Sequence, residues 1–187
     1  MLGQDPYLGE VFPDPPLVAY KRQRNIRDNL IKSRIPNLNT REHRITPGMK
    51  RCGKCVLCPY VLEGKQVTTK IANWNILKSF NCDTQNVIYM IQCKKQRCRN
   101  SDTYIYIGET EHPIKNRIGQ HIGYIKNKVT TQATGQHFNF PGHSVSDMEF
   151  SVLEQPNSWD LVYRKEREKY HIRKFNTYYR GLNRAPE

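Results

Sequence analysis

The chain has 187 residues and carries 30 Lys and Arg against 17 Asp and Glu, a formal net charge of +13. A charge this positive on so short a chain indicates a polyanionic partner, and nucleic acid is the commonest one. No apolar run approaches the ~20 residues that span a bilayer, so we expect no membrane contact. The N-terminus lacks a secretory signal, and the six cysteines are therefore expected to be thiols or metal ligands of an intracellular protein.

The first 51 residues are expected to lie outside any folded core. Residues 1–20 are rich in proline and lack periodicity, which predicts an extended arm. Residues 21–51 predict a basic helix, with Ile26 and Leu30 at helical spacing before Pro36, and then a polar linker. The alternative to a phosphate-binding helix is a solvated helix face. The basic residues that we expect to contact nucleic acid here are Lys21, Arg22, Arg24, Arg27, Lys32 and Arg34.

A tight group of cysteines follows the polar linker. Cys52, Cys55 and Cys58 are separated by two residues each, so that three thiolates can turn toward one cation. Cys82 is the nearest remaining thiol and would complete a tetrahedral zinc site, with His43 as its competitor for the fourth position. The alternative is a set of unligated thiols.

From Asn86 the sequence takes on the periodicities of a mixed domain. The runs VIYMIQC and TYIYIGE are rich in β-branched and aromatic residues and predict two strands. Residues 112–128 predict a helix, because isoleucines recur along one of its faces. Residues 149–153 alternate like a third strand, and residues 158–176 predict a second helix with an apolar stripe.

Polar side chains on these elements form a set suited to cutting a phosphodiester with a single metal ion. The carboxylate of the set, Glu168, falls on the apolar stripe that also holds Leu161 and Ile172. A carboxylate is costly there unless a metal ion or a buried arginine pairs with it; the alternative is a glutamate at the edge of the stripe that reaches solvent. The candidate catalytic residues are Tyr89, Tyr106, Arg117, His121, Glu168 and Asn183.

Two cysteines and two histidines of the same region have spacings close to those of zinc ligands. Cys93 ends the first strand, and Cys98 lies in the connection to the second. His137 and His143 follow the first helix, with five residues between them. A hairpin could bring the cysteines together, whereas the alternative is a buried cysteine pair and two surface histidines.

The order of these residues resembles the GIY-YIG endonuclease family. The first family signature stands here as Val87-Ile88-Tyr89, with valine in place of glycine, and the second is intact as Tyr106-Ile107-Gly108. The positions that match the family's Arg-x3-His, its metal-binding glutamate and its late asparagine are Arg117, His121, Glu168 and Asn183.

A narrower resemblance is to the endonuclease domain of Penelope-like retroelements. In that group the two cysteines between the signatures and the two downstream histidines are a recognised pairing. The basic stretch before the nuclease resembles the segment that follows a reverse transcriptase thumb. Because no polymerase signature occurs, we expect a C-terminal piece of a larger protein, or a decayed or domesticated copy. His171 stands where that group usually has a tryptophan.

The resemblance implies an α+β fold in which a three-stranded antiparallel sheet is flanked by helices and presents both tyrosines. A basic helical and zinc-binding linker would precede this small domain. We therefore divide the chain into an extended arm, a basic helix with its linker, a cysteine-rich zinc-binding linker and a GIY-YIG endonuclease domain, with the bounds 1–20, 21–51, 52–85 and 86–187.

The resemblance also implies a role for each site residue. Glu168 would hold one Mg²⁺ or Mn²⁺, and Arg117 would bind a phosphate oxygen. Tyr89 would be the general base or a relay to it, provided that a nearby cation lowers its pKa. Tyr106 and His121 would position water and phosphate. Asn183 would orient Glu168 or the phosphate, and the basic residues expected to contact DNA beside the site are Lys115, Lys126 and Lys128.

The expected function is metal-dependent cleavage of target DNA for retroelement integration in the nucleus, in a protein with two structural zinc ions. Its partners would be the DNA target, the element RNA and a reverse transcriptase domain of the same polyprotein. One alternative is a zinc-stabilised nucleic-acid binder that no longer cuts. Another is a repair-type nuclease subunit, which shares the site but does not call for the cysteine linker.

Overall fold

The computed structural model describes residues 46–101 and 104–183, all within one packing unit that begins at Ile45. The predicted arm, the basic helix and the alternative zinc ligand His43 lie outside these residues. The same holds for the predicted contacts Lys21, Arg22, Arg24, Arg27, Lys32 and Arg34. Among the described helices, none combines the length and the apolar character that a membrane crossing requires.

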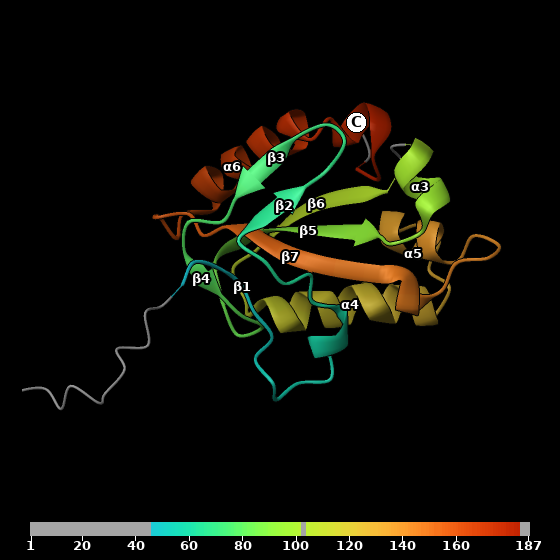
Figure 1. Cartoon of the computed structure of the whole chain (residues 1–187), viewed down its shortest axis with the longest axis horizontal. Coiled ribbons are helices and arrows are strands. Elements are labelled where there is room, and N and C mark those ends of the chain that lie inside the picture. Colours follow the sequence, from blue (N-terminus) through green and yellow to red (C-terminus); the bar gives the residue numbers. More distant parts are fainter. Residues whose placement is uncertain (1–45, 102–103, 184–187) are drawn as a thin grey trace, which may run out of the picture. The chain divides into compact units, whose positions relative to one another are not determined.

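A three-stranded antiparallel sheet forms the centre of the fold (Figure 1). Strand β5 (Val87–Cys93) lies between β6 (Ile105–Thr110) and β7 (Met148–Glu154). Every residue of β5 is buried, which explains why its sequence is a continuous apolar run. Tyr89 of β5 pairs with Gly108 of β6, so the two signature motifs meet across the ladder. The predicted α+β fold is confirmed.

Helices flank this sheet, and in Figure 1 it lies between α6 (Leu161–Lys174) and α4 (Ile114–Lys126). The isoleucine stripe of α4 is buried as predicted. Ile172 of α6 and Phe175, just after the helix, are buried, but Leu161 is 55% exposed. The expectation that Leu161 belongs to the inward stripe is therefore wrong, because the buried position one turn later is taken by Arg164. Shorter helical elements are α3 (Gln96–Ser101), α5 (Ala133–Phe138), α7 (Thr177–Arg180), η2 (Cys58–Tyr60) and η3 (Val145–Asp147).

The cysteine-rich segment is part of the same core, which corrects its assignment as a separate linker. Its side chains Val61, Phe80 and Cys82 are buried in one cluster with the residues of β5 and β7. The backbone N–H of Leu62 donates to the carbonyl of Phe150 in β7. The strands of this segment are too short to enclose a core of their own; they are β1 (Gly48–Met49), β2 (Gln66–Thr68), β3 (Asn73–Asn75) and β4 (Ser79–Phe80).

Trp74 of β3 shows how closely this segment joins the central sheet and α6. Its indole Nε1 donates to the carbonyl of Leu153 at 2.7 Å. Its ring meets His171 of α6 edge-on, with centroids 4.5 Å apart. His171, the departure from the Penelope-like pattern, is buried and its Nε2 lies 2.8 Å from Glu154. The indole that packs against His171 of α6 therefore comes from another element, strand β3.

We expect a fragment of residues 86–187 to fail to fold, whereas residues 46–187 should melt cooperatively. The shorter fragment exposes the apolar surface that Val61 and Phe80 cover. In the longer fragment, Val61→Ala should cost about 1–3 kcal/mol because it leaves a cavity. Thermal melts followed by circular dichroism measure both effects. A cooperative melt of 86–187 at an unchanged temperature would refute the shared core.

Candidate active site

The two signature tyrosines lie side by side on adjacent strands. The ring centroids of Tyr89 and Tyr106 are 6.3 Å apart. Gly108 lies between them, and a Cβ there would stand 2.5 Å from the hydroxyl of Tyr89 and 2.9 Å from the ring of Tyr106. Any larger residue would push both rings apart, so the glycine of the second signature is required by the close approach of the two rings.

The hydroxyl of Tyr89 joins two residues of α4 in a buried chain of hydrogen bonds. Arg117 Nε donates to it at 3.1 Å, and Nε2 of His121 lies 2.8 Å away. Nδ1 of His121 is in turn 2.9 Å from the hydroxyl of Thr134 in α5. Since Arg117 donates to the phenol oxygen, the phenol proton can be donated to His121 Nε2, and Nδ1 then donates to Thr134.

Burial keeps the histidine in this chain of hydrogen bonds neutral. It lowers the pKa of His121 to about 3, and the positive charge of Arg117 adds to the effect. Both nitrogens of the neutral ring are occupied within the protein. This corrects the expectation that His121 positions water or phosphate: the histidine instead fixes the hydroxyl of Tyr89. Thr134 was missed, because nothing in the sequence marks a buried threonine as the partner of a histidine 13 residues earlier.

The two phenols differ in access. Tyr89 is fully buried, and burial raises its pKa well above the ordinary value despite the charge of Arg117. The lowering that a tyrosine base requires is therefore not supplied by the protein, and a relay of the proton to His121 is disfavoured as well, because the pKa of that histidine is only about 3. Tyr106 is only partly buried, although burial raises its pKa as well. Tyr106 is thus the phenol that a water molecule can reach.

Glu168 lies at one end of an ion-pair network that runs through Lys165 and Glu109 to Arg164. Its side chain is 15% exposed, and burial raises its pKa. Lys165 Nζ lies 3.0 Å from its Oε2 and 2.9 Å from Oε1 of Glu109 in β6. The other oxygen of Glu109 pairs with Arg164, which is 2% exposed and also reaches Glu111. The partner of the inward carboxylate is therefore a lysine. The sequence could have predicted this ion pair, because residues three positions apart on a helix are neighbours on its surface.

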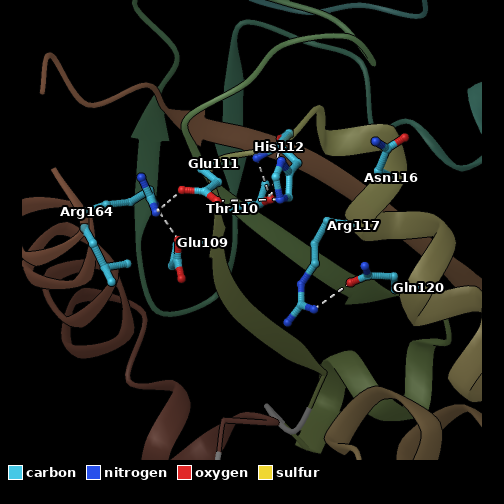
Figure 2. Close-up of a pocket in the computed structure, with 9 residues that line it drawn as sticks. Glu109, Thr110, Glu111, His112, Asn116, Arg117, Gln120 and Arg164 are labelled. Carbon is cyan, nitrogen blue, oxygen red and sulfur yellow. Dashed lines mark hydrogen bonds and ion pairs between the residues drawn. The ribbon is translucent and has the colours of Figure 1, made fainter. Parts of the chain in front are cut away.

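A hollow of about 410 Å³ lies beside these groups, between α4 and α6. Figure 2 shows Arg164 reaching in from α6 and Arg117 from α4, with Glu109 and Glu111 between them. Arg117 therefore belongs both to the hollow and to the hydrogen bond with Tyr89. A negatively charged group in this hollow can reach the arginine. The lining is Glu109, Thr110, Glu111, His112, Asn116, Arg117, Gln120, Leu161 and Arg164.

Asn183 has a structural contact in place of the expected one. Its side-chain Oδ1 accepts from the backbone N–H of Ile107, and its Nδ2 donates to the carbonyl of the same residue, both at 2.8 Å. The side-chain amide thus binds the backbone of strand β6. This corrects the prediction that Asn183 orients Glu168 or the phosphate. The asparagine holds the backbone between Tyr106 and Gly108.

Both predicted zinc-ligand sets come together, and within residues 46–101 and 104–183 they are the two groups suited to a metal ion. The first is the thiol cluster, in which Cys58 Sγ lies 3.6 Å from that of Cys52 and 3.7 Å from that of Cys55. A tetrahedral site with 2.3 Å bonds places sulfurs roughly 3.8 Å apart. Cys82 completes the cluster.

The second set joins the end of β5 to the segment after α4. Cys98 Sγ lies 3.0 Å from Nε2 of His143, and all four ligand atoms, including that of Cys93, are within 4.8 Å of one another. Nε2 of His137 is buried and has no hydrogen-bond partner, as expected of an atom meant to bind a metal ion. Both sets fit structural zinc.

The basic residues predicted beside the site are placed differently from one another. Lys115 Nζ forms an ion pair with Asp83 at 2.6 Å, at the start of α4. Lys126 and Lys128 are exposed near the end of the helix. Their contact with DNA stays a prediction.

The comparison with known families places these features in one region. The profile of the GIY-YIG catalytic domain matches residues 85–183, slightly more than half of the chain. The matched region contains the candidate catalytic residues and the cysteine–histidine set, and it begins after the thiol cluster. No curated protein and no solved structure matches the chain.

Nucleases with this domain use divalent metals, and Glu168 fits such an ion. Mg²⁺ is commonly held by one or two carboxylates together with waters and phosphate oxygens. Glu168 offers a hard oxygen ligand that is mostly buried and near Arg117. The catalytic metal would therefore be held by Glu168, whereas the thiol and cysteine–histidine sets suit zinc.

We expect two zinc ions per chain by elemental analysis. Cys55→Ser and His143→Ala should each lower Tm by about 5 °C or more, since loss of roughly 2 kcal/mol has that effect at this size. Cys55→Ser should affect the whole domain, because the thiol cluster shares the core. A metal content of one or none, or melts equal to wild type, would contradict the assignment.

The low pKa of His121 predicts a pH dependence of stability. The unfolded chain binds this proton near pH 6.5 and the folded chain only near 3. The stability from neutral His121 is thus complete above about pH 6.5 and is lost as the pH falls toward 3, by about 1.4 kcal/mol per pH unit between them. We expect His121→Gln to melt with a shallower pH slope between 6.5 and 4.5. The exposed control His112→Gln should keep the wild-type slope; equal slopes in all three proteins would disprove the assignment.

Proposed function

Since the chain belongs to the GIY-YIG family, whose catalytic domain implies nuclease activity on DNA, we propose that it hydrolyses DNA phosphodiesters with a single divalent metal ion. The observation that supports the proposal best is the position of Arg117. One edge of its guanidinium donates to Tyr89, and the same side chain lines the hollow together with Glu109. Burial raises the pKa of Glu168 and the positive charge of Arg117 opposes this effect, so the arginine lies near that carboxylate. An arginine in this place can bind a phosphate oxygen and keep the attacking water near the phenols.

Each residue has a task in this proposal. Arg117 binds a non-bridging oxygen of the scissile phosphate and counters the charge that develops there. Tyr106, the accessible phenol, positions the attacking water beside Tyr89. The hydroxyl of Tyr89, held between Arg117 and His121, fixes the guanidinium that binds the phosphate, and the proton of the attacking water leaves to solvent. Thr134 holds the histidine in the tautomer that accepts the hydrogen bond of the Tyr89 hydroxyl.

The metal ion would add what these side chains lack. Glu168 would hold Mg²⁺ or Mn²⁺, and the ion would supply Lewis-acid stabilisation of the negative charge that develops on the phosphate and the leaving oxygen. In the absence of metal, the carboxylate is paired with Lys165. The two structural zinc ions would take no part in the reaction.

The substrate that we propose is target DNA cut for the integration of a Penelope-like retroelement in the nucleus. The signature order, the cysteine–histidine set and the preceding thiol cluster support this origin. Element RNA and a reverse transcriptase domain of the same polyprotein would be the further partners. The valine that replaces the first signature glycine is compatible with cutting, since Val87 is buried and pairs with Thr110, away from the phenol hydroxyls.

We expect Glu168→Ala and Arg117→Ala to abolish Mg²⁺-dependent nicking of supercoiled DNA while binding stays within a few-fold of wild type. Binding rests on many basic residues, whereas the chemistry needs these two positions. Glu166→Ala and Arg173→Ala remove the same kinds of charge from exposed positions of α6 and should leave nicking intact.

Gel assays of nicking and filter binding of the same variants distinguish the outcomes. Equal loss of binding and nicking would mean that the two residues are structural. A wild-type protein that binds DNA but cuts none at any metal concentration would favour the zinc-stabilised binding module.

A further inference from the structure

We propose that Lys165 is a positioning residue that holds the metal-binding carboxylate in the absence of metal and must give way when the divalent ion binds. The inference rests on the proposed function in one respect, the assignment of Glu168 as metal ligand. It concerns a residue outside the family signatures. Its consequence is that the metal dependence of this enzyme is set by a lysine of the same helix.

The contacts of Lys165 show that its ammonium lies between the carboxylates of Glu109 and Glu168. Its ammonium is shared between Glu168 and Glu109, at 3.0 and 2.9 Å. The two carboxylates come from different elements, α6 and β6, and are 15% and 14% exposed. Two largely buried carboxylates facing each other repel unless a cation lies between them. The ammonium fills the place that a divalent ion would otherwise be drawn to.

A metal ion and the ammonium compete for Glu168. Mg²⁺ bonds to a carboxylate oxygen at about 2.1 Å, so that both cations on Oε2 would lie within about 5 Å of each other. At this separation, in a partly buried site, their repulsion is strong. The ammonium must therefore leave Glu168 or weaken the binding of the metal.

Glu109 gives the displaced ammonium a place to stay. Its Oε1 binds Lys165, while its other oxygen is occupied by the buried Arg164 (Figure 2 shows Glu109 and Arg164). Lys165 itself is 49% exposed and has room to turn. The network thus contains a fixed pair, Glu109 with Arg164, and a movable cation that links it to Glu168.

The test measures Mn²⁺ binding to the zinc-loaded full chain by electron paramagnetic resonance, without DNA. Lys165→Met should bind Mn²⁺ about tenfold more tightly, because a like charge is removed from the site. Lys165→Arg keeps the charge and should bind close to wild type. Lys169→Met removes an exposed lysine from the next turn of α6 and should have no effect. Glu168→Gln should abolish the tight site.

A second readout follows nicking as a function of Mg²⁺ concentration. The half-saturating concentration for Lys165→Met should fall by the same factor as its Mn²⁺ dissociation constant. Mn²⁺ binding that is unchanged or weaker in Lys165→Met, or equally tighter in Lys169→Met, would overturn the proposal. If no variant cuts DNA while Lys165→Met alone tightens Mn²⁺, the competition stands and the proposed nuclease function fails.

Discussion

The hydroxyl of Tyr89 lies in the core between Arg117 and His121, both supplied by α4. A buried hydroxyl without partners costs roughly 1–3 kcal/mol, so the strand and the helix must meet in one register. The same contact requires a bare backbone at Gly108 opposite the phenol. Helix, sheet and site are therefore not separate features, since the hydrogen bonds that satisfy the core are also those that align the candidate catalytic groups.

Both zinc sets brace the surroundings of this contact. The carbonyl of Cys82 accepts from the backbone N–H of Lys115, in the first turn of α4. The other set includes His137 of α5, the short helix that also carries Thr134. The thiol cluster thus holds the start of α4, which bears Arg117. The cysteine–histidine set holds α5, whose Thr134 binds His121. This explains how a basic chain with short strands can keep a well-ordered site.

The sequence predicted the elements whose signals are local. The isoleucine spacing of α4 and the apolar run of β5 are patterns of neighbouring residues, and the order of the signature positions identified the family. What failed depends on partners far away in the chain. Asn183 bonds to Ile107, 76 residues earlier, and Trp74 bonds to Leu153, 79 residues later. Periodicity carries no signal for such pairs. Lys165 was within reach as a helical neighbour of Glu168, but its second partner, Glu109, was not.

The indole of Trp74 has a consequence for the modularity of this nuclease. It lies before the matched family region, yet it packs against His171 and bonds to β7 within that region. The folded unit of this domain is thus longer than the region that the family profile matches. A gene fusion that moved only residues 85–183 onto another protein would leave the indole behind and a buried histidine without its cover. A transfer that keeps this fold intact has to carry the preceding segment as well.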